Sequence, residues 1–140
     1  MNRPGSGSCE TLIRRATVID GTGGPAVTAD VAIAEGRIAA VGDLSGWRAD
    51  KTVAAEGKVL SPGFIDVHTH DDAVVIDRPD MLSKLSQGVT TVVVGNCGIS
   101  AAPVALSGEP PDPMNLLGTP STFRYPTFAS YVAAVDAAHP

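Results

Sequence analysis

The chain has 140 residues, of which 44% are hydrophobic and 18% are charged, and its formal net charge is −5. This composition favours a packed core over disorder, and the lack of a Lys/Arg-rich run argues against nucleic acid as the main partner. No apolar run approaches the roughly 20 residues that cross a bilayer, which argues against a membrane protein.

Residues 1–10 are rich in Gly and Ser and are expected to form a flexible leader, in which Cys9 is assigned no role. The leader lacks the apolar stretch of a signal peptide, so we expect a cytoplasmic protein. No pattern in the sequence specifies an oligomeric state.

Residues 11–60 carry the pattern of small antiparallel β-structure. Glu35-Gly36 separates two strand-type runs and predicts a β-hairpin with a two-residue loop, and a second pair of short strands is expected about Glu56-Gly57. The predicted strands occupy residues 12–20, 30–34, 37–41 and 51–60. The turns between them are as closely spaced as in a β-sandwich, so residues 11–60 are predicted to form a β-sandwich portion.

The pattern changes in residues 61–140, where a strand, a helix and a second strand follow one another. Residues 64–68 are predicted as a short strand, and residues 79–87 as a helix that starts at a proline and ends before a glycine. Residues 89–94 form a β-branched run, which is typical of a parallel strand buried on both faces. These three elements predict a βαβ unit.

The remaining residues predict a loop and one more helix. Residues 100–126 are rich in Pro and Gly and are expected to form a long loop, whereas residues 128–135 have the apolar spacing of an amphipathic helix. One βαβ unit and one helix leave sheet edges open and an apolar helix face without a partner. We therefore expect these residues to be part of a larger α/β domain.

Two histidines stand at the end of the predicted strand 64–68. Side chains alternate between the faces of a strand, so Asp66, His68 and His70 point the same way. Cys97 follows the next predicted strand, and parallel neighbours lie ~4.8 Å apart, so His68, His70 and Cys97 are expected at one C-terminal sheet edge. Imidazole nitrogen together with thiolate sulfur favours zinc over magnesium or calcium. We predict that His68, His70 and Cys97 bind one or two Zn²⁺ ions.

Other interpretations of these residues stay open. A His-x-His pair is common by chance, and a single cysteine after a strand is more often a small buried hydrophobic residue than a ligand. Asp66 and Asn96 are predicted to lie just outside the ligands, where Asp66 would orient an imidazole, and a simple strand-end cap is the alternative for Asp66. Asp71 and Asp72 are expected in a loop or at a helix start rather than as ligands.

Three segments of the chain resemble the amidohydrolase superfamily and, within it, the N-acyl-D-amino-acid deacylases, or D-aminoacylases. Pro62 to Asp72 (PGFIDVHTHDD) carries the superfamily pattern. Gln87 to Ser100 (QGVTTVVVGNCGIS) contains Gly-Asn-Cys-Gly, which is the sharper signal for the deacylase branch. Val18 to Gly23 is the third matching segment, and the resemblance covers nearly the whole chain after residue 10.

This resemblance implies an α/β fold with a (β/α)8 barrel beside a small β-sandwich. Residues 11–60 would supply part of the β-sandwich, and residues 61–140 would supply the first βα units of an incomplete barrel. His68 and His70 match the metal ligands of the first barrel strand, and Cys97 matches a thiolate that can bridge two zinc positions. The implied reaction is hydrolysis of an N-acyl-D-amino acid to a carboxylate and a free D-amino acid.

The family's pattern also includes two further histidines and a catalytic aspartate from later barrel strands, for which these 140 residues contain no counterpart. No catalytic residue is therefore assigned within the chain, because the general base is expected beyond residue 140. We predict that the 140 residues alone are inactive and poorly folded. The expected partner is a small N-acyl amino acid, whose acyl group and side chain the sequence does not specify.

Two alternatives accompany this interpretation. The first is another amidohydrolase branch, dihydropyrimidinase-like or isoaspartyl-dipeptidase-like, which would bridge its metals with a lysine or a glutamate. The second is a non-catalytic metal-binding fragment, because two histidines and a cysteine can bind an ion without supporting a reaction.

Overall fold

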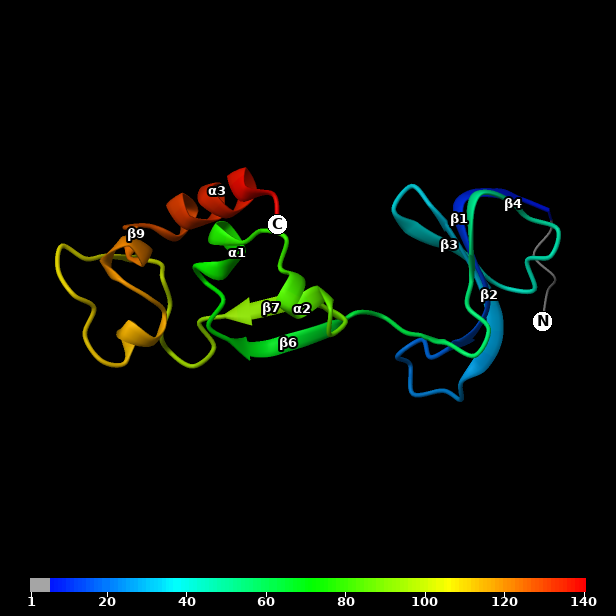
Figure 1. The fold of residues 1–140 in the computed structure, drawn as a ribbon, viewed down its shortest axis with the longest axis horizontal. Helices are drawn as coiled ribbons and strands as arrows, with labels where there is room; N and C mark the ends of the chain where they lie inside the picture. The colour runs from blue at the N-terminus through cyan, green and yellow to red at the C-terminus, as the bar shows by residue number, and fades with distance from the viewer. Residues whose placement is uncertain (1–5) are drawn as a thin grey trace. The chain divides into compact units, whose positions relative to one another are not determined.

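The computed structural model describes residues 6–140 and contains two compact units, the first ending at Pro62 and the second beginning at Gly63. Figure 1 shows the strands of the first unit and the mixed helices and strands of the second. Each unit has buried hydrophobic clusters of its own.

The first unit is a five-stranded sheet with the strand order β3-β2-β1-β4, and β5 also pairs with β1. The predicted hairpin is confirmed, because β2 and β3 are antiparallel and the chain turns at Glu35 and Gly36. The strands are β1 (Ser8–Val18), β2 (Val27–Ala34), β3 (Arg37–Gly42), β4 (Arg48–Ala54) and β5 (Val59–Leu60).

The predicted flexible leader, residues 1–10, is too long at its C-terminal end. Ser8 and Cys9 belong to β1 and pair with Arg48 and Ala49 of β4. Cys9 is only 7% exposed and packs in a cluster with Leu12, so it is part of the core rather than of a loose tail. Residues 1–5 of the predicted leader lie outside the described residues.

The expectation that this sheet is wholly antiparallel is wrong, because β4 and β5 both run parallel to β1. After β4, the chain stops pairing with β1 at Ala55 and turns through Glu56 and Gly57. It pairs with β1 again from Lys58, running in the same direction. The Ala55 N–H donates to the Arg14 carbonyl on one side of the turn, and the Thr17 N–H donates to the Lys58 carbonyl on the other, both at 2.9 Å. A Glu-Gly turn therefore interrupts one strand here instead of reversing it.

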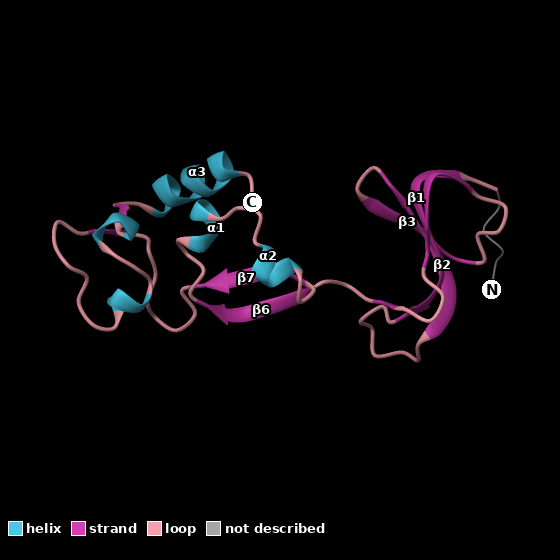
Figure 2. Ribbon diagram, in the orientation of Figure 1, coloured by secondary structure: helices cyan, strands magenta, loops and turns pink. Residues whose placement is uncertain are grey.

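The second unit contains the predicted βαβ unit, in which β6 and β7 are parallel neighbours. Figure 2 shows β6 and β7 side by side, together with the helices of this unit. Its strands are β6 (Phe64–Thr69), β7 (Val89–Val94), β8 (Val104–Ala105) and β9 (Arg124–Tyr125). Its helices are α1 (Val74–Asp77), α2 (Leu82–Leu85) and α3 (Phe128–Ala138), with 3₁₀ turns at Met114–Leu116 and Pro120–Thr122.

The helix predicted over residues 79–87 is shorter in the structure. Met81 takes a left-handed conformation with φ 43°, which a helix cannot continue through, so α2 begins at Leu82. Gly88, with φ 79°, ends the segment as the sequence predicts. The short helix α1 was not predicted.

The prediction that residues 89–94 are buried on both faces is wrong. None of the six side chains of β7 is buried, and Val93 is 40% exposed. The reason is that this sheet has two strands in the part of the chain that the structure describes, so its faces are only partly covered. The β-branched run correctly predicted a parallel strand, but it did not predict how exposed the side chains of that strand are.

The long segment 100–126 is partly ordered by β8 and β9, which pair antiparallel. The helix predicted over residues 128–135 is confirmed as α3, and the Thr127 side chain caps its start by accepting from the Ser130 N–H. Tyr131 packs on a buried cluster that includes Ala101 and Tyr125. Across residues 6–140, no helix has the length and apolar character needed to span a membrane.

Candidate metal centre

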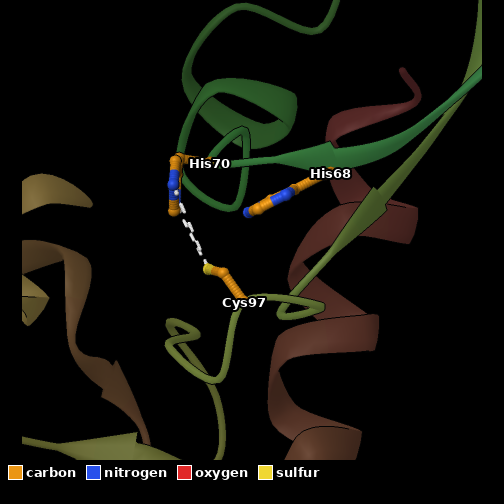
Figure 3. A group of neighbouring side chains, drawn as sticks. All are labelled: His68, His70 and Cys97. Carbon is orange, nitrogen blue, oxygen red and sulfur yellow. Dashed lines mark hydrogen bonds between the residues drawn. The ribbon is translucent and has the colours of Figure 1, made fainter.

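The structure brings His68, His70 and Cys97 together, and the ligand atoms that they offer lie within 4.8 Å of one another. The Cys97 Sγ atom is 3.8 Å from Nδ1 of His70, and the two imidazole centroids are 5.9 Å apart. Figure 3 shows the His70 ring facing the thiol, with His68 beside them on β6. All three side chains are exposed, so an ion has open access to them.

The cluster forms because β6 and β7 end side by side. Thr69 pairs with Val94, so the histidines at the end of β6 and the loop after β7 leave the sheet at the same edge. Gly95 and Gly98 have φ angles of 77° and 91°, and the Gly98 N–H donates to the Gly95 carbonyl at 3.0 Å. This tight turn holds Cys97 at its tip, and its left-handed positions favour glycine.

The donor atoms fit zinc. Zn–N and Zn–S bonds of about 2.0 and 2.3 Å at a tetrahedral angle place a nitrogen and a sulfur roughly 3.5 Å apart. The 3.8 Å between Cys97 Sγ and His70 Nδ1 is close to that value. Two imidazoles and one thiol also form a donor set suited to zinc rather than to a hard cation such as magnesium.

Asp66, predicted to orient an imidazole, bonds to the main chain of His68 instead. Its Oδ1 accepts from the His68 backbone N–H at 3.3 Å, and its Oδ2 accepts from Lys84 Nζ at 2.9 Å. Asn96, also predicted beside the ligands, donates from Nδ2 to the Val67 carbonyl at 2.8 Å. Asn96 thus ties the loop that carries Cys97 to the strand that carries the histidines.

Lys84 on α2 reaches the carboxylates on both sides of the histidine pair. Its Nζ lies 2.9 Å from Asp66 Oδ2 and 2.9 Å from Asp71 Oδ2, and its side chain is 23% exposed. Asp71 also accepts a short hydrogen bond from the Thr69 hydroxyl. The strand end that bears His68 and His70 is therefore fastened to α2. Sequence reasoning missed Lys84, whose signal was a cation between two leucines of a predicted helix.

These contacts also change the acidity of the groups that make them. The hydrogen bond from Lys84 holds the pKa of Asp66 below its usual value, and the His68 N–H adds to this effect. The bonds to Asp66 and then to Asp71 raise the pKa of Lys84. Both shifts favour the charged forms, so the ion pairs persist across neutral pH.

Comparison with known proteins agrees with this geometry. The sequence profile of the amidohydrolase family matches residues 51–140, which include the whole candidate site. The chain belongs to the amidohydrolase family. Within the family, this amidohydrolase chain is 49% identical over 124 residues to N-acyl-D-aspartate deacylase of Alcaligenes xylosoxydans xylosoxydans, covering 89% of this chain and 25% of the relative.

Two further amidohydrolases extend the comparison. D-aminoacylase from the same bacterium is 47% identical over 137 residues, which cover 98% of this chain and 28% of that protein. The solved structure of N-acyl-D-glutamate deacylase from Bordetella bronchiseptica, complexed with zinc and a phosphonate inhibitor, matches with a TM-score of 0.85 and 46% identity over 95% of this chain and 28% of that one. The chain thus spans about a quarter of the length of these relatives.

Proposed function

We propose that the protein is a zinc-dependent hydrolase that cleaves the C–N amide bond of an N-acyl-D-amino acid and releases the D-amino acid. The main observation behind this proposal is the cluster of His68, His70 and Cys97, whose donor atoms lie within 4.8 Å of one another. The chain is also an amidohydrolase that resembles deacylases of N-acyl-D-amino acids. Zinc, when bound, polarises a carbonyl group and lowers the pKa of a water to about 7.

The residues of this chain would then bind the ion from two directions. His68 and His70 supply imidazole nitrogens from the end of β6, and Cys97 supplies a thiolate from the turn after β7. The thiolate charge offsets part of the charge of the cation. We expect the general base to come from outside these residues, so the 140 residues alone would be inactive.

The same resemblance supports a finer description of the fold. We propose that β6, α2 and β7 begin a (β/α)8 barrel and that β1 to β5 form part of a β-sandwich. The parallel pairing of β6 and β7 and the placement of the candidate ligands after the strand ends suit a barrel, whose sites lie at that face. The five-stranded sheet of the first unit supports the proposal of a β-sandwich.

Two other functions are less well supported. A dihydropyrimidinase-like or isoaspartyl-dipeptidase-like enzyme is the first alternative, but the relatives with 47 to 49% identity are deacylases of D-substrates. A non-catalytic metal-binding fragment is the second, and a turnover measurement tests it. The substrate is proposed to be a small molecule, as it is for those relatives.

The first test measures the amine released from N-acetyl-D-methionine and from its L-enantiomer by the protein as its source cell makes it, with zinc present. The proposal expects turnover of the D form and none of the L form. Turnover of the L form alone, or zinc binding without turnover of a panel of N-acyl-D-amino acids, would contradict it.

Replacing the thiol tests the metal site separately. We expect Cys97→Ser to lower zinc content after dialysis and to reduce turnover at least 100-fold, because a hydroxyl is a far poorer zinc ligand than a thiolate. Cys9→Ser is the matched control, since Cys9 is buried in the first unit beside Leu12. In the Co²⁺-loaded protein, the thiolate-to-cobalt absorption should disappear only in Cys97→Ser, and its survival there would remove Cys97 from the site.

A further inference from the structure

Asp72 joins the two loops that carry the candidate zinc ligands. It follows His70 by two residues and is fully buried, with 0% exposure. Its Oδ1 atom accepts from the Ser100 hydroxyl and from the Ala101 backbone N–H, both at 2.9 Å. Ser100 and Ala101 follow Cys97 by three and four residues. One carboxylate oxygen therefore connects the His70 loop to the Cys97 loop.

The main chain of Asp72 is anchored as well. Its carbonyl oxygen accepts from the Tyr131 hydroxyl of α3 at 3.0 Å. Tyr131 in turn packs in the buried cluster that contains Ala101 and Ala102. Helix α3 thus holds both sides of the connection, since it contacts Asp72 through a hydrogen bond and the segment after Cys97 through apolar packing.

Burying the Asp72 carboxylate reduces the stability of the fold unless hydrogen bonds compensate. Removing a charged group from water is unfavourable unless hydrogen bonds compensate, and the compensation here is one-sided. The Asp72 Oδ2 atom is buried and has no hydrogen-bond partner among residues 6–140. The three donors that contact Asp72 all act on Oδ1 or on the carbonyl oxygen, and the Oδ1 pair orients the backbone just after Cys97.

We infer that Asp72 is a positioning residue that sets the approach of Cys97 to His70, and so determines how tightly the site binds zinc. The inference rests on the proposed zinc site. The Cys97 thiol and the His70 ring are 3.8 Å apart although both side chains are exposed and lie on loops, so neither is held by burial. The Asp72 bonds to Ser100 and Ala101 fix the backbone that follows Cys97 relative to the backbone that follows His70.

The test measures zinc affinity by competition with a chromophoric chelator in the whole protein, together with the cobalt–thiolate absorption. Residues that support metal ligands in this way typically change affinity about 10–100-fold when replaced. We expect Asp72→Ala to weaken zinc binding by that factor and to alter the cobalt spectrum. Ser100→Ala, which removes one of the two bonds, should weaken it about threefold to tenfold. Asp77→Ala, at an exposed carboxylate of α1, is the control and should change neither readout.

Asp72→Asn distinguishes position from charge. The amide oxygen can accept the same two hydrogen bonds, so we expect this variant to recover most of the affinity that Asp72→Ala loses. If Asp72→Ala does not fold, the zinc affinities of Ser100→Ala and Asp72→Asn still test the inference. Unchanged zinc affinity in Ser100→Ala overturns it. Wild-type protein that binds zinc only as tightly as folded Asp72→Ala overturns the inference alone. Wild-type protein that binds no zinc overturns the proposed function as well.

Discussion

Tyr131 is the described side chain whose acidity burial changes most. Its hydroxyl donates to the Asp72 carbonyl, and its ring stands edge-on to Tyr125 with centroids 5.3 Å apart. Burial raises the pKa of Tyr131 from 10.0 to about 12, and the charges of Asp72 and Tyr125 add to the shift. The phenol therefore stays neutral and keeps donating where an exposed tyrosine would ionise.

The folded protein should lose stability in a defined alkaline window. Because the folded pKa of Tyr131 is raised, its contribution is complete below pH 10 and is lost as the pH rises through 12. One pKa unit corresponds to about 1.4 kcal/mol, so the loss is on the order of 2 kcal/mol. Denaturant unfolding of wild type and Tyr131→Phe at several alkaline pH values measures it. The two slopes against pH should differ, and parallel slopes would disprove the assignment.

The sequence could predict the three candidate ligands but not the residues that hold them. His68 and His70 share a strand face and Cys97 follows the next strand, so local periodicity and one parallel pairing suffice. Lys84 acts through a contact between α2 and β6, and Asp72 acts through a contact between two loops. No spacing rule connects Lys84 with Asp66 or Asp72 with Ser100. Asp72 was expected to be only a loop or helix-start residue.

At the scale of elements, the start of β6 fits tightly against β7. A Cβ atom on Gly63 would lie 2.7 Å from Thr90 Cβ and closer still to its Oγ1 and Cγ2 atoms. Phe64 pairs with Val89 directly beside this contact. The spacing of the two strands that carry the candidate site therefore requires a residue without a side chain at position 63.

Gly63→Ala should destabilise the protein by about 1–3 kcal/mol, because the added methyl group overpacks the strand pair. Gly108→Ala is the control, since a Cβ there meets nothing within 4 Å, and its effect should stay within about 0.5 kcal/mol. Thermal and denaturant unfolding compare the two. Equal stability of both variants would show that β6 and β7 separate freely at this point.

Strand existence was easier to predict than strand direction. The runs in residues 30–41 predicted the hairpin correctly because a two-residue Glu-Gly loop can close antiparallel neighbours. A second Glu-Gly pair at residues 56–57 carries the same local signal, yet β4 and β5 continue in one direction along β1. The difference comes from pairing with a strand about 40 residues earlier, which local turn chemistry does not contain.

At the scale of the whole molecule, metal binding and folding should be linked. An ion that binds only the folded state stabilises it, by about 2.7 kcal/mol when free zinc is 100 times its dissociation constant. We expect chelation to lower the melting temperature of the wild-type protein and zinc to restore it. Cys97→Ser should show little response to either treatment. A wild-type melting temperature that is insensitive to the chelator would argue against zinc at this site.

The two-unit organisation and the α/β character could be predicted because the residue pattern changes abruptly at Pro62. Burial could not, since it depends on what covers each face. Val67 is 58% exposed and Leu82 is 65% exposed, although both have the apolar character of core residues. The sequence pattern specifies which faces are apolar, but it does not specify what covers them. The 140 residues span about a quarter of the length of their relatives.

All three candidate ligands come from one short stretch of chain, between residues 68 and 97. Closing a loop of this length costs less entropy than joining residues farther apart in the chain, and such local contacts form more quickly during folding. During synthesis on the ribosome, the donors would meet once the chain through Ala101, which bonds to Asp72, has emerged. Zinc bound at that stage would link the end of β6 to the turn after β7 while synthesis continues.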